Sequence, residues 1–224
     1  MIAVFDIDGT LTDTMGVDIE CYISAVREVV GIDVPEELDA YDEFTDAAVL
    51  ETACRLCDHP LPTSDVQRRT ALRLAEMLEE ALDSTPHRFR PIPGARDVFE
   101  SLKRAGWRVA MATGAWRPSA MVKLTGAEIP YQGVPLATSS EHRARTDIIS
   151  RAVSEVGGDG SGQVVYIGDG VWDGRAAAAL GYGFIGIGAG DRQARLREVG
   201  AAAVFENLSD DRALVAALER VIDS

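Results

Sequence analysis

The sequence lacks the features that mark secreted and membrane-embedded proteins. Its 224 residues include three cysteines, Cys21, Cys54 and Cys57, too few for a disulfide framework. No apolar run approaches the roughly 20 residues that a membrane-spanning helix needs. Only five residues precede the first aspartate, and they include no basic region and no cleavage site, so we expect no signal peptide. These absences favour a reducing, cytoplasmic location.

Positive charge is also scarce. The chain has 22 lysines and arginines against 36 aspartates and glutamates, which gives a formal net charge of -14. Because such a surface repels phosphate backbones and anionic lipids, we expect neither nucleic acid nor membrane as a partner. A small phosphorylated metabolite would also be repelled unless a local cationic pocket or a metal receives it. Nothing in the sequence predicts the oligomeric state.

Short apolar segments alternate with helical ones along most of the chain. Strands are expected at 2–5, 107–112, 134–137, 164–167, 184–187 and 202–205, and helices between them at 95–105, 146–156, 172–180 and 192–199. This alternation predicts an α/β fold, with a Rossmann-like parallel sheet covered by helices on both faces. Reactive loops in such sheets follow the carboxyl ends of the strands.

The alternation fails between residues 14 and 90, where we expect helices only. The expected helices are 17–30, 45–57 and 64–82. The last has an apolar stripe at helical spacing, and Ser64 is predicted to cap it. We therefore predict an all-helical domain, 14–90, inserted into a catalytic core domain that comprises 1–13 and 91–224.

Two of the expected strands end in acidic loops. Asp6 and Asp8 follow the first strand, and Asp169 and Asp173 follow strand 164–167. Because parallel strands bring both loops to one edge of the sheet, up to four carboxylates converge there. They would repel one another unless a cation lies among them or some are protonated. Carboxylate oxygens suit Mg²⁺, so we predict a magnesium site formed by these aspartates.

The neighbouring residues suit a phosphate group. Gly9 permits a sharp bend after Asp8, and Thr10 offers a hydroxyl. A third strand end supplies Thr113, with a second hydroxyl, and a backbone turn at Gly114 that can bind phosphate oxygens. A carboxylate that attacks phosphorus is a covalent strategy that needs a metal to offset the repulsion between two anions.

In type and order, these motifs resemble those of the haloacid-dehalogenase-like (HAD) superfamily over essentially the whole chain. The resemblance implies that Asp6 is the nucleophile and Asp8 the general acid/base. It implies that Thr113 is the hydroxyl residue of the second motif, and that Asp169 and Asp173 are the metal-binding acids of the fourth. It also implies that the insertion is a helical cap, as in phosphoglycolate phosphatases and beta-phosphoglucomutases.

The third motif departs from the family pattern. The family normally has a lysine at the start of the helix after the third strand, and the only lysines here, Lys103 and Lys123, both lie too early. We predict that Arg145 takes this place because it directly precedes the expected helix start, with Arg143 as the second candidate. A guanidinium keeps its charge and can hold carboxylate or phosphate with two hydrogen bonds.

Asp8 also narrows the chemistry that the resemblance implies. Dehalogenases of the family lack this second aspartate, and phosphonate-cleaving members replace it with a small residue and use a cap lysine. Segment 14–90 contains no lysine, so both chemistries are disfavoured. We expect an Mg²⁺-dependent phosphatase that acts through an aspartyl-phosphate. The alternatives are a sugar-phosphate mutase and a phospho-acceptor regulator without catalytic activity.

Substrate recognition is expected in the insertion, first of all at residues 41–46. Thr45 and Asp46 are predicted to hydrogen-bond the substrate, in addition to the phosphate contacts of Gly9, Thr10 and Gly114. The alternative for Thr45 is that it only caps the helix that follows.

Two other motifs are given structural interpretations. Residues 181–186 fit GxGxxG, but a dinucleotide site needs a strand before this motif and a helix after it, and the opposite order is expected here. Cys54 and Cys57 form a CxxC pair without a second pair, so we predict two buried thiols on one helix face rather than a zinc site.

Overall fold

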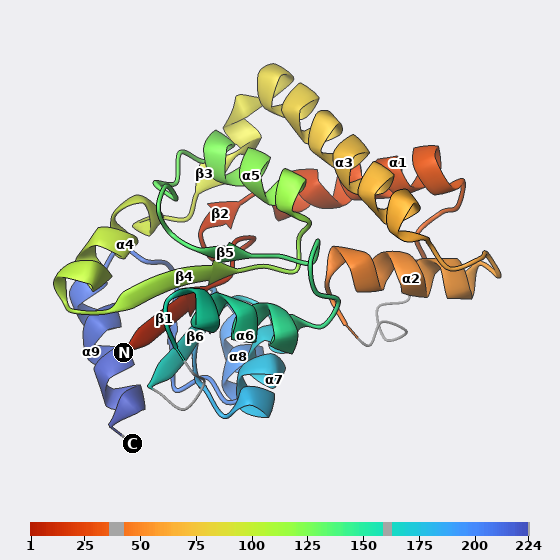
Figure 1. Cartoon of the computed structure of the whole chain (residues 1–224). Coiled ribbons are helices and arrows are strands. Elements are labelled where there is room, and N and C mark those ends of the chain that lie inside the picture. The colour runs from red at the N-terminus through yellow and green to blue at the C-terminus, as the bar shows by residue number, and fades with distance from the viewer. Residues whose placement is uncertain (36–42, 159–162, 224) are drawn as a thin grey trace.

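The computed structural model describes residues 1–35, 43–158 and 163–223. Its centre is a six-stranded sheet, β5-β4-β1-β6-β7-β8, in which every pair is parallel. The strands are β1 (Ile2–Phe5), β4 (Arg108–Ala112), β5 (Leu136–Ala137), β6 (Val164–Gly168), β7 (Gly183–Ile187) and β8 (Ala203–Phe205). The predicted Rossmann-like α/β fold is confirmed (Figure 1).

Helices cover both faces of this sheet, because successive strand residues point to opposite sides. In β1, Ala3 and Phe5 belong to one hydrophobic core, and Ile2 and Val4 belong to the other. The first face is covered by α4 (Ala95–Arg104), α5 (Arg117–Gly126) and α9 (Asp211–Ile222). The second is covered by α6 (Arg145–Glu155), α7 (Val171–Leu180) and α8 (Asp191–Glu198).

The segment between residues 14 and 90, called here the helical insertion, forms a separate layer beyond one edge of the sheet (Figure 1). Its helices are α1 (Met15–Val30), α2 (Asp46–Leu56) and α3 (Ser64–Ser84), followed by the 3₁₀ turn η2 (Pro86–Arg88). They share a hydrophobic core that also takes in Trp116 and Val122 from the sheet-bearing part. The domain boundary stays a prediction.

The expectation of helices only in this region misses one small feature. The chain leaves the sheet through β2 (Thr12–Asp13) and returns through β3 (Arg90–Pro91), and these two strands pair antiparallel. The two connections to the helical insertion therefore run side by side. Among the described residues, no helix combines the length and the hydropathy needed to cross a membrane.

Helices α5 and α9 were not among the predicted elements. Helix α5 has no side-chain cap, and it is buried on two sides, since Val122 packs in the core of the insertion and Leu124 in the core of the sheet. Burial on two sides removes the single apolar stripe by which a surface helix is recognised in a sequence.

Two smaller predictions were wrong. The cap of α3 is Thr63, whose hydroxyl accepts a hydrogen bond from the Val66 N–H, while Ser64 is the first helical residue. Cys54 is buried as predicted, but Cys57 is exposed, because α2 ends at Leu56 and the second thiol lies past its last turn.

The GxGxxG segment has the predicted order of elements: it follows α7 and leads into β7, with Gly181 in a left-handed conformation that ends the helix.

Candidate active site

Asp6 lies at the carboxyl end of β1 and is almost fully buried. Its Oδ1 has no hydrogen-bond partner in the structure, and the Nη1 of Arg145 lies 3.5 Å from it. Burial, together with the nearby carboxylate of Asp173, raises the pKa of Asp6 well above its usual range. A buried carboxylate oxygen without a donor marks a position where a cation or a reacting group fits.

The chain turns sharply after Asp8, and only glycine suits the position that follows. Gly9 has a φ of +75°, and a Cβ added there would lie 2.1 Å from the Oδ2 of Asp169. Its N–H donates to the carbonyl of Thr12 at 2.8 Å. Gly9 therefore shapes the turn, and its N–H is not free to donate to a ligand. The hydroxyl of Thr10 is buried and has no hydrogen-bond partner among the described residues.

The second acidic loop follows β6. Asp169 is buried, its Oδ1 has no hydrogen-bond partner, and its Oδ2 accepts from the Nη1 of Arg192 at 2.5 Å. Burial and the charge of Asp173 raise the pKa of Asp169 to about 7. Asp173 is the third residue of α7, where its Oδ2 accepts from the Gly170 N–H at 2.9 Å. Asp173 thus has the geometry of a helix N-terminal acid.

The residues present fit a magnesium ion. Asp6, Asp169 and Asp173 each offer a carboxylate oxygen, and these oxygens all lie within 4.8 Å of one another. The Oδ1 atoms of Asp6 and Asp169 are buried without hydrogen bonds, whereas both oxygens of Asp173 accept hydrogen bonds. Asp6 and Asp169 are therefore the better placed donors. That Asp6, Asp8, Asp169 and Asp173 bind a metal stays a prediction.

Arg145 supplies the cation that lies beside this acidic cluster. It is the first residue of α6 and is buried; its Nη1 donates to Asp173 at 3.0 Å and lies 3.4 Å from the hydroxyl of Tyr166. Burial alone would lower the pKa of Arg145, but Asp173, Tyr166 and Asp6 together outweigh burial and raise it. The second candidate, Arg143, pairs instead with Glu51 at 2.6 Å. Tyr166, on β6, was not predicted as a site residue.

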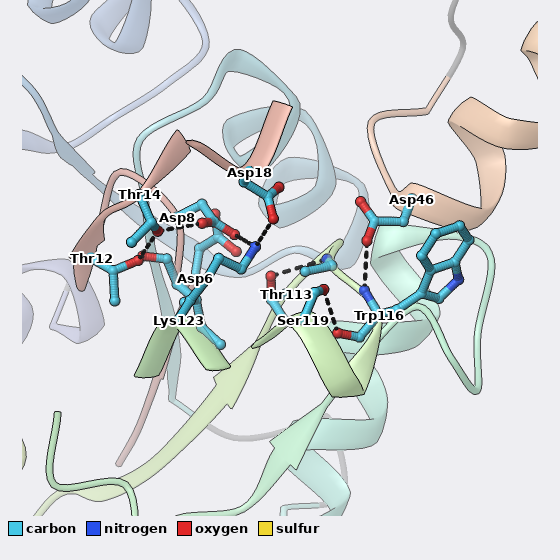
Figure 2. A network of polar contacts seen from close by, with 12 residues as sticks. Asp6, Asp8, Thr12, Thr14, Asp18, Asp46, Thr113, Trp116, Ser119 and Lys123 are labelled. Carbon is cyan, nitrogen blue, oxygen red and sulfur yellow. Dashed lines mark hydrogen bonds and ion pairs between the residues drawn. The ribbon is translucent and has the colours of Figure 1, made fainter. Parts of the chain in front are cut away.

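Asp8 has a partner that sequence reasoning missed. Lys123, on α5, is fully buried, and its Nζ donates to Asp8 Oδ2 at 2.6 Å and lies 2.9 Å from Asp18 Oδ1 (Figure 2). The other Asp8 oxygen accepts from the hydroxyl of Thr14 at 2.8 Å. Burial would lower the pKa of Lys123, but Asp18 and Asp8 raise it, so the ammonium stays charged. The sequence placed Lys123 too early to be the lysine of the third motif, and α5, the helix that carries it, was not predicted.

The loop after β4 connects the site to the helical insertion. Thr113 is buried, and its hydroxyl accepts from the Ala115 N–H at 3.1 Å. The carbonyl of Gly114 accepts from the Asp46 N–H at 2.8 Å, and a Cβ at Gly114 would lie 2.7 Å from the carbonyl of Phe44. Glycine therefore allows the insertion to approach the sheet here, and the role of Gly114 in binding phosphate stays a prediction.

Thr45 and Asp46 lie at this contact, whereas Tyr41 and Asp42 of the same predicted loop are outside the described residues. The hydroxyl of Thr45 accepts from the Ala48 N–H at 3.3 Å and donates to the carbonyl of Arg143 at 2.8 Å. This geometry agrees with the alternative interpretation of Thr45, in which its hydroxyl caps the helix that follows. Asp46 Oδ2 accepts from the Trp116 N–H at 2.8 Å (Figure 2), and burial together with Asp18 raises its pKa to about 8.

Most of the predicted site residues line a cavity of about 450 Å³ between the sheet and the helical insertion, whereas Gly9, Thr10 and Asp173 are not among its lining residues. Its sheet side includes Asp6, Asp8, Asp169, Thr113 and Arg145, and its insertion side includes residues of α1 and α2. The aromatic rings of the two sides also touch across it, since Phe44 stacks on Trp172 with ring centroids 4.7 Å apart. The insertion therefore closes over the carboxylates.

The fold has many relatives among solved structures. A hydrolase from Pseudomonas syringae is 21% identical with a TM-score of 0.75, and the alignment covers 98% of each chain. CbbY from Rhodobacter sphaeroides, in complex with phosphate, is 23% identical with a TM-score of 0.70, and 98% of this chain and 100% of that one are covered. A predicted phosphoglycolate phosphatase from Haemophilus somnus 129pt is 18% identical with a TM-score of 0.66, covering 95% and 96%.

The neighbours thus include phosphoglycolate phosphatase-like and beta-phosphoglucomutase-like proteins, and at these identities they establish the fold alone. No curated protein sequence matches the chain. The model of the haloacid dehalogenase-like hydrolase family matches residues 1–181, which contain every predicted catalytic and metal-binding residue. The chain therefore belongs to the haloacid dehalogenase-like hydrolase family.

Proposed function

We propose that the protein is a magnesium-dependent phosphatase that hydrolyses a small phosphorylated metabolite through an aspartyl-phosphate on Asp6. One observation carries the proposal: Asp6, whose Oδ1 accepts no hydrogen bond from the described residues, lines the same cavity as a second carboxylate, Asp8, and a buried cation, Arg145. A nucleophile, a proton-transfer group and an anion-binding group are the three parts that this reaction needs.

In the first step, an oxygen of Asp6 attacks phosphorus, a new O–P bond forms, and the bond from phosphorus to the ester oxygen breaks. Protonated Asp8 gives its proton to the departing oxygen. In the second step, Asp8 takes a proton from water, which attacks the phosphorus of the aspartyl-phosphate and regenerates the Asp6 carboxylate. The hydrogen bonds from Lys123 and Thr14 hold Asp8 in place for both proton transfers.

The surrounding groups position the phosphoryl group. Arg145 has a buried Nε without a hydrogen-bond partner, so it can donate to a phosphoryl oxygen while its other nitrogens keep their contacts with Asp173 and Phe44. We assign the hydroxyl of Thr113 the same task. A magnesium ion held by Asp6 and Asp169 would offset the repulsion between carboxylate and phosphate.

The helical insertion would exclude bulk water from this reaction. Its closed position is held by the Phe44–Trp172 stack and by the hydrogen bond from Arg145 Nη2 to the Phe44 carbonyl at 2.7 Å. Enclosure of the substrate is of use to an enzyme and of little use to a phospho-acceptor regulator without turnover. This arrangement supports hydrolysis over the regulator alternative.

The test is phosphate release from a panel of phosphomonoesters, with and without Mg²⁺, by the wild type and Asp6→Asn. We expect release that depends on Mg²⁺ and is abolished in Asp6→Asn, because an amide does not attack phosphorus. Asp13→Asn is the matched control, since Asp13 is half-exposed and pairs with Arg90 away from the cavity. Near-normal turnover by folded Asp6→Asn would contradict the mechanism. Dependence on an added bisphosphate would indicate a mutase instead.

A further inference from the structure

The cavity has two chemically different ends. The sheet side holds the groups assigned to the phosphoryl group, which leaves the insertion side to receive the rest of the substrate. Aliphatic side chains of α1 and α2 line that side, among them Ile19, Ile23 and Val49. The charged groups there are two carboxylates, Asp18 from α1 and Asp46 from α2.

Cations are missing from the insertion side. Within the described ranges, no lysine, arginine or histidine of the helical insertion lines the cavity. Residues 36–42, outside those ranges, contain none in their sequence. Arginines of the insertion form ion pairs elsewhere, as Arg73 does with Glu28 and Arg88 with Glu20.

Two cations adjoin this side, and both are already engaged. Arg145 pairs with Asp173 and donates to the Phe44 carbonyl. Lys123 lies beneath the cavity and pairs with both Asp8 and Asp18. Asp46, which Figure 2 shows hydrogen-bonded to Trp116 rather than to Lys123, is a third carboxylate whose charge acts on the Lys123 ammonium. One ammonium among three carboxylates leaves an excess of negative charge, and low-dielectric walls strengthen its effect on a ligand.

Asp46 also keeps an oxygen for a ligand. Its Oδ2 accepts from the Trp116 N–H, and within the described part of the chain its Oδ1 has no hydrogen-bond donor. Burial first, and then the charge of Asp18, raise the pKa of Asp46 to about 8, so Asp46 acts as a charged acceptor above that pH. A substrate group that donates a hydrogen bond here would satisfy the acid, whereas an anion would add a further like charge.

Resting on the proposed phosphatase function, we infer that the substrate's leaving group carries no negative charge and donates a hydrogen bond to Asp46 through a hydroxyl or an ammonium. Phosphomonoesters of neutral or amino alcohols belong to this class. Esters that carry a carboxylate or a second phosphate on the leaving group do not. The same charge pattern opposes a bisphosphate intermediate of the kind that a sugar-phosphate mutase must hold.

The experiment, run at about pH 9 where Asp46 is charged, compares three esters that differ only in the group at the far carbon: 2-aminoethyl phosphate, 2-hydroxyethyl phosphate and 2-phosphoglycolate. We expect kcat/KM for the amino and hydroxy esters to exceed that for phosphoglycolate by about tenfold or more, which corresponds to about 1.4 kcal/mol. A preference for the amino ester over the hydroxy ester identifies the ammonium as the donor, and equal values identify the hydroxyl as sufficient.

The variant Asp46→Asn keeps an acceptor for Trp116 and removes the charge. It should reduce the discrimination against phosphoglycolate by about fivefold, through a rise in the phosphoglycolate value. Asp65→Asn is the matched control, because Asp65 is an exposed carboxylate of the insertion that pairs with Arg68 on the surface of α3. It should leave all three values unchanged.

Hydrolysis of 4-nitrophenyl phosphate in the same assays separates the two hypotheses. If this generic ester is hydrolysed and phosphoglycolate equals or exceeds the other two, the inference about the leaving group is overturned and the phosphatase function stands. If no ester is hydrolysed, the proposed function fails, and thermal shifts with the three esters in Mg²⁺ then test the inference by binding alone. A larger shift with phosphoglycolate would overturn it.

Discussion

The site contains two buried cations, and they are built in different ways. Arg145 begins a helix at the sheet edge and contacts carboxylates of the sheet-bearing part, Asp6 and Asp173. Lys123 comes from the middle of α5 and joins Asp8 to Asp18 of the helical insertion. Each carboxylate assigned to the chemistry thus has its own cation. One cation belongs to the phosphoryl site, and the other ties that site to the insertion.

The largest effect expected from this comparison is on catalysis, at Arg145. Arg145→Ala should lower kcat/KM about 10³-fold, or ~4 kcal/mol, because it removes the donors assigned to the phosphoryl oxygens. Arg145→Lys should retain part of the activity, since it keeps the charge but loses the planar fork. Phosphate release and melting curves measure both. Arg143→Ala is the control, and a loss there as large as in Arg145→Ala would move the phosphate-binding role to Arg143.

The next effect is on stability, at Lys123. Lys123→Met should reduce the free energy of unfolding by about 3 kcal/mol or more, because Asp8 and Asp18 lose the cation that compensates their burial. Urea unfolding measures it. The other lysine is a matched control, since Lys103 is half-exposed and pairs with Glu100 on the surface of α4, so Lys103→Met should have little effect. Adding Asp18→Asn to Lys123→Met should recover part of the loss.

A smaller effect is expected at the metal site, where a third cation competes. Arg192 is half-exposed and pairs with Asp169, one of the two aspartates best placed to bind magnesium. Arg192→Gln should therefore tighten Mg²⁺ binding about fivefold, or ~1 kcal/mol. Titration calorimetry and Mg²⁺-dependent melting would show it without an activity assay, with exposed Arg195→Gln as control. Weaker binding in the variant would mean that Arg192 orients Asp169 for the metal.

The last effect concerns the pH dependence of stability at Asp46. Its folded-state pKa of about 8 lies above the unfolded value near 4, so the folded state binds the proton more tightly. The wild type should thus lose stability as pH rises from about 4 to 8 and gain it as pH falls. Asp46→Asn lacks this contribution, so its melting temperature should exceed that of the wild type more at pH 8.5 than at pH 5. A constant difference would contradict the raised pKa.

Much of the fold followed from local pattern. The strand Ile2–Phe5 was predicted to the residue, and the other strands of the sheet differ at their ends by two residues or fewer. Short apolar runs bounded by turns give this precision, since buried parallel strands need little else. Helix α5 was not predicted because it is buried on two sides, and α9 (Asp211–Ile222) was likewise absent from the predicted elements.

The site residues differ in the same way, according to whether nearby residues determine their position. Asp6, Asp169 and Arg145 were predicted as site residues because their place at strand or helix ends is encoded in nearby residues, and the structure brings them to one cavity. Lys123 lies 115 residues from its partner Asp8, and no local pattern connects them. Its pairing requires the three-dimensional arrangement of α1 and α5 against β1. A search for motifs therefore does not identify residues that bridge two parts of a protein, even where the motif on one side is clear.

One contact of Arg145 has a consequence for timing. Its Nη2 holds the carbonyl of Phe44, while its Nη1 lies among the carboxylates at the phosphoryl end. The position of the helical insertion and the charge state at Asp6 thus act on a single rigid, planar group. By thermodynamic reciprocity, whatever makes phosphate bind more tightly to this group in the closed form also favours closure to the same extent. Under the proposed phosphatase function, departure of inorganic phosphate would weaken the hold on the insertion, so that release of one product would prepare the opening for the next substrate.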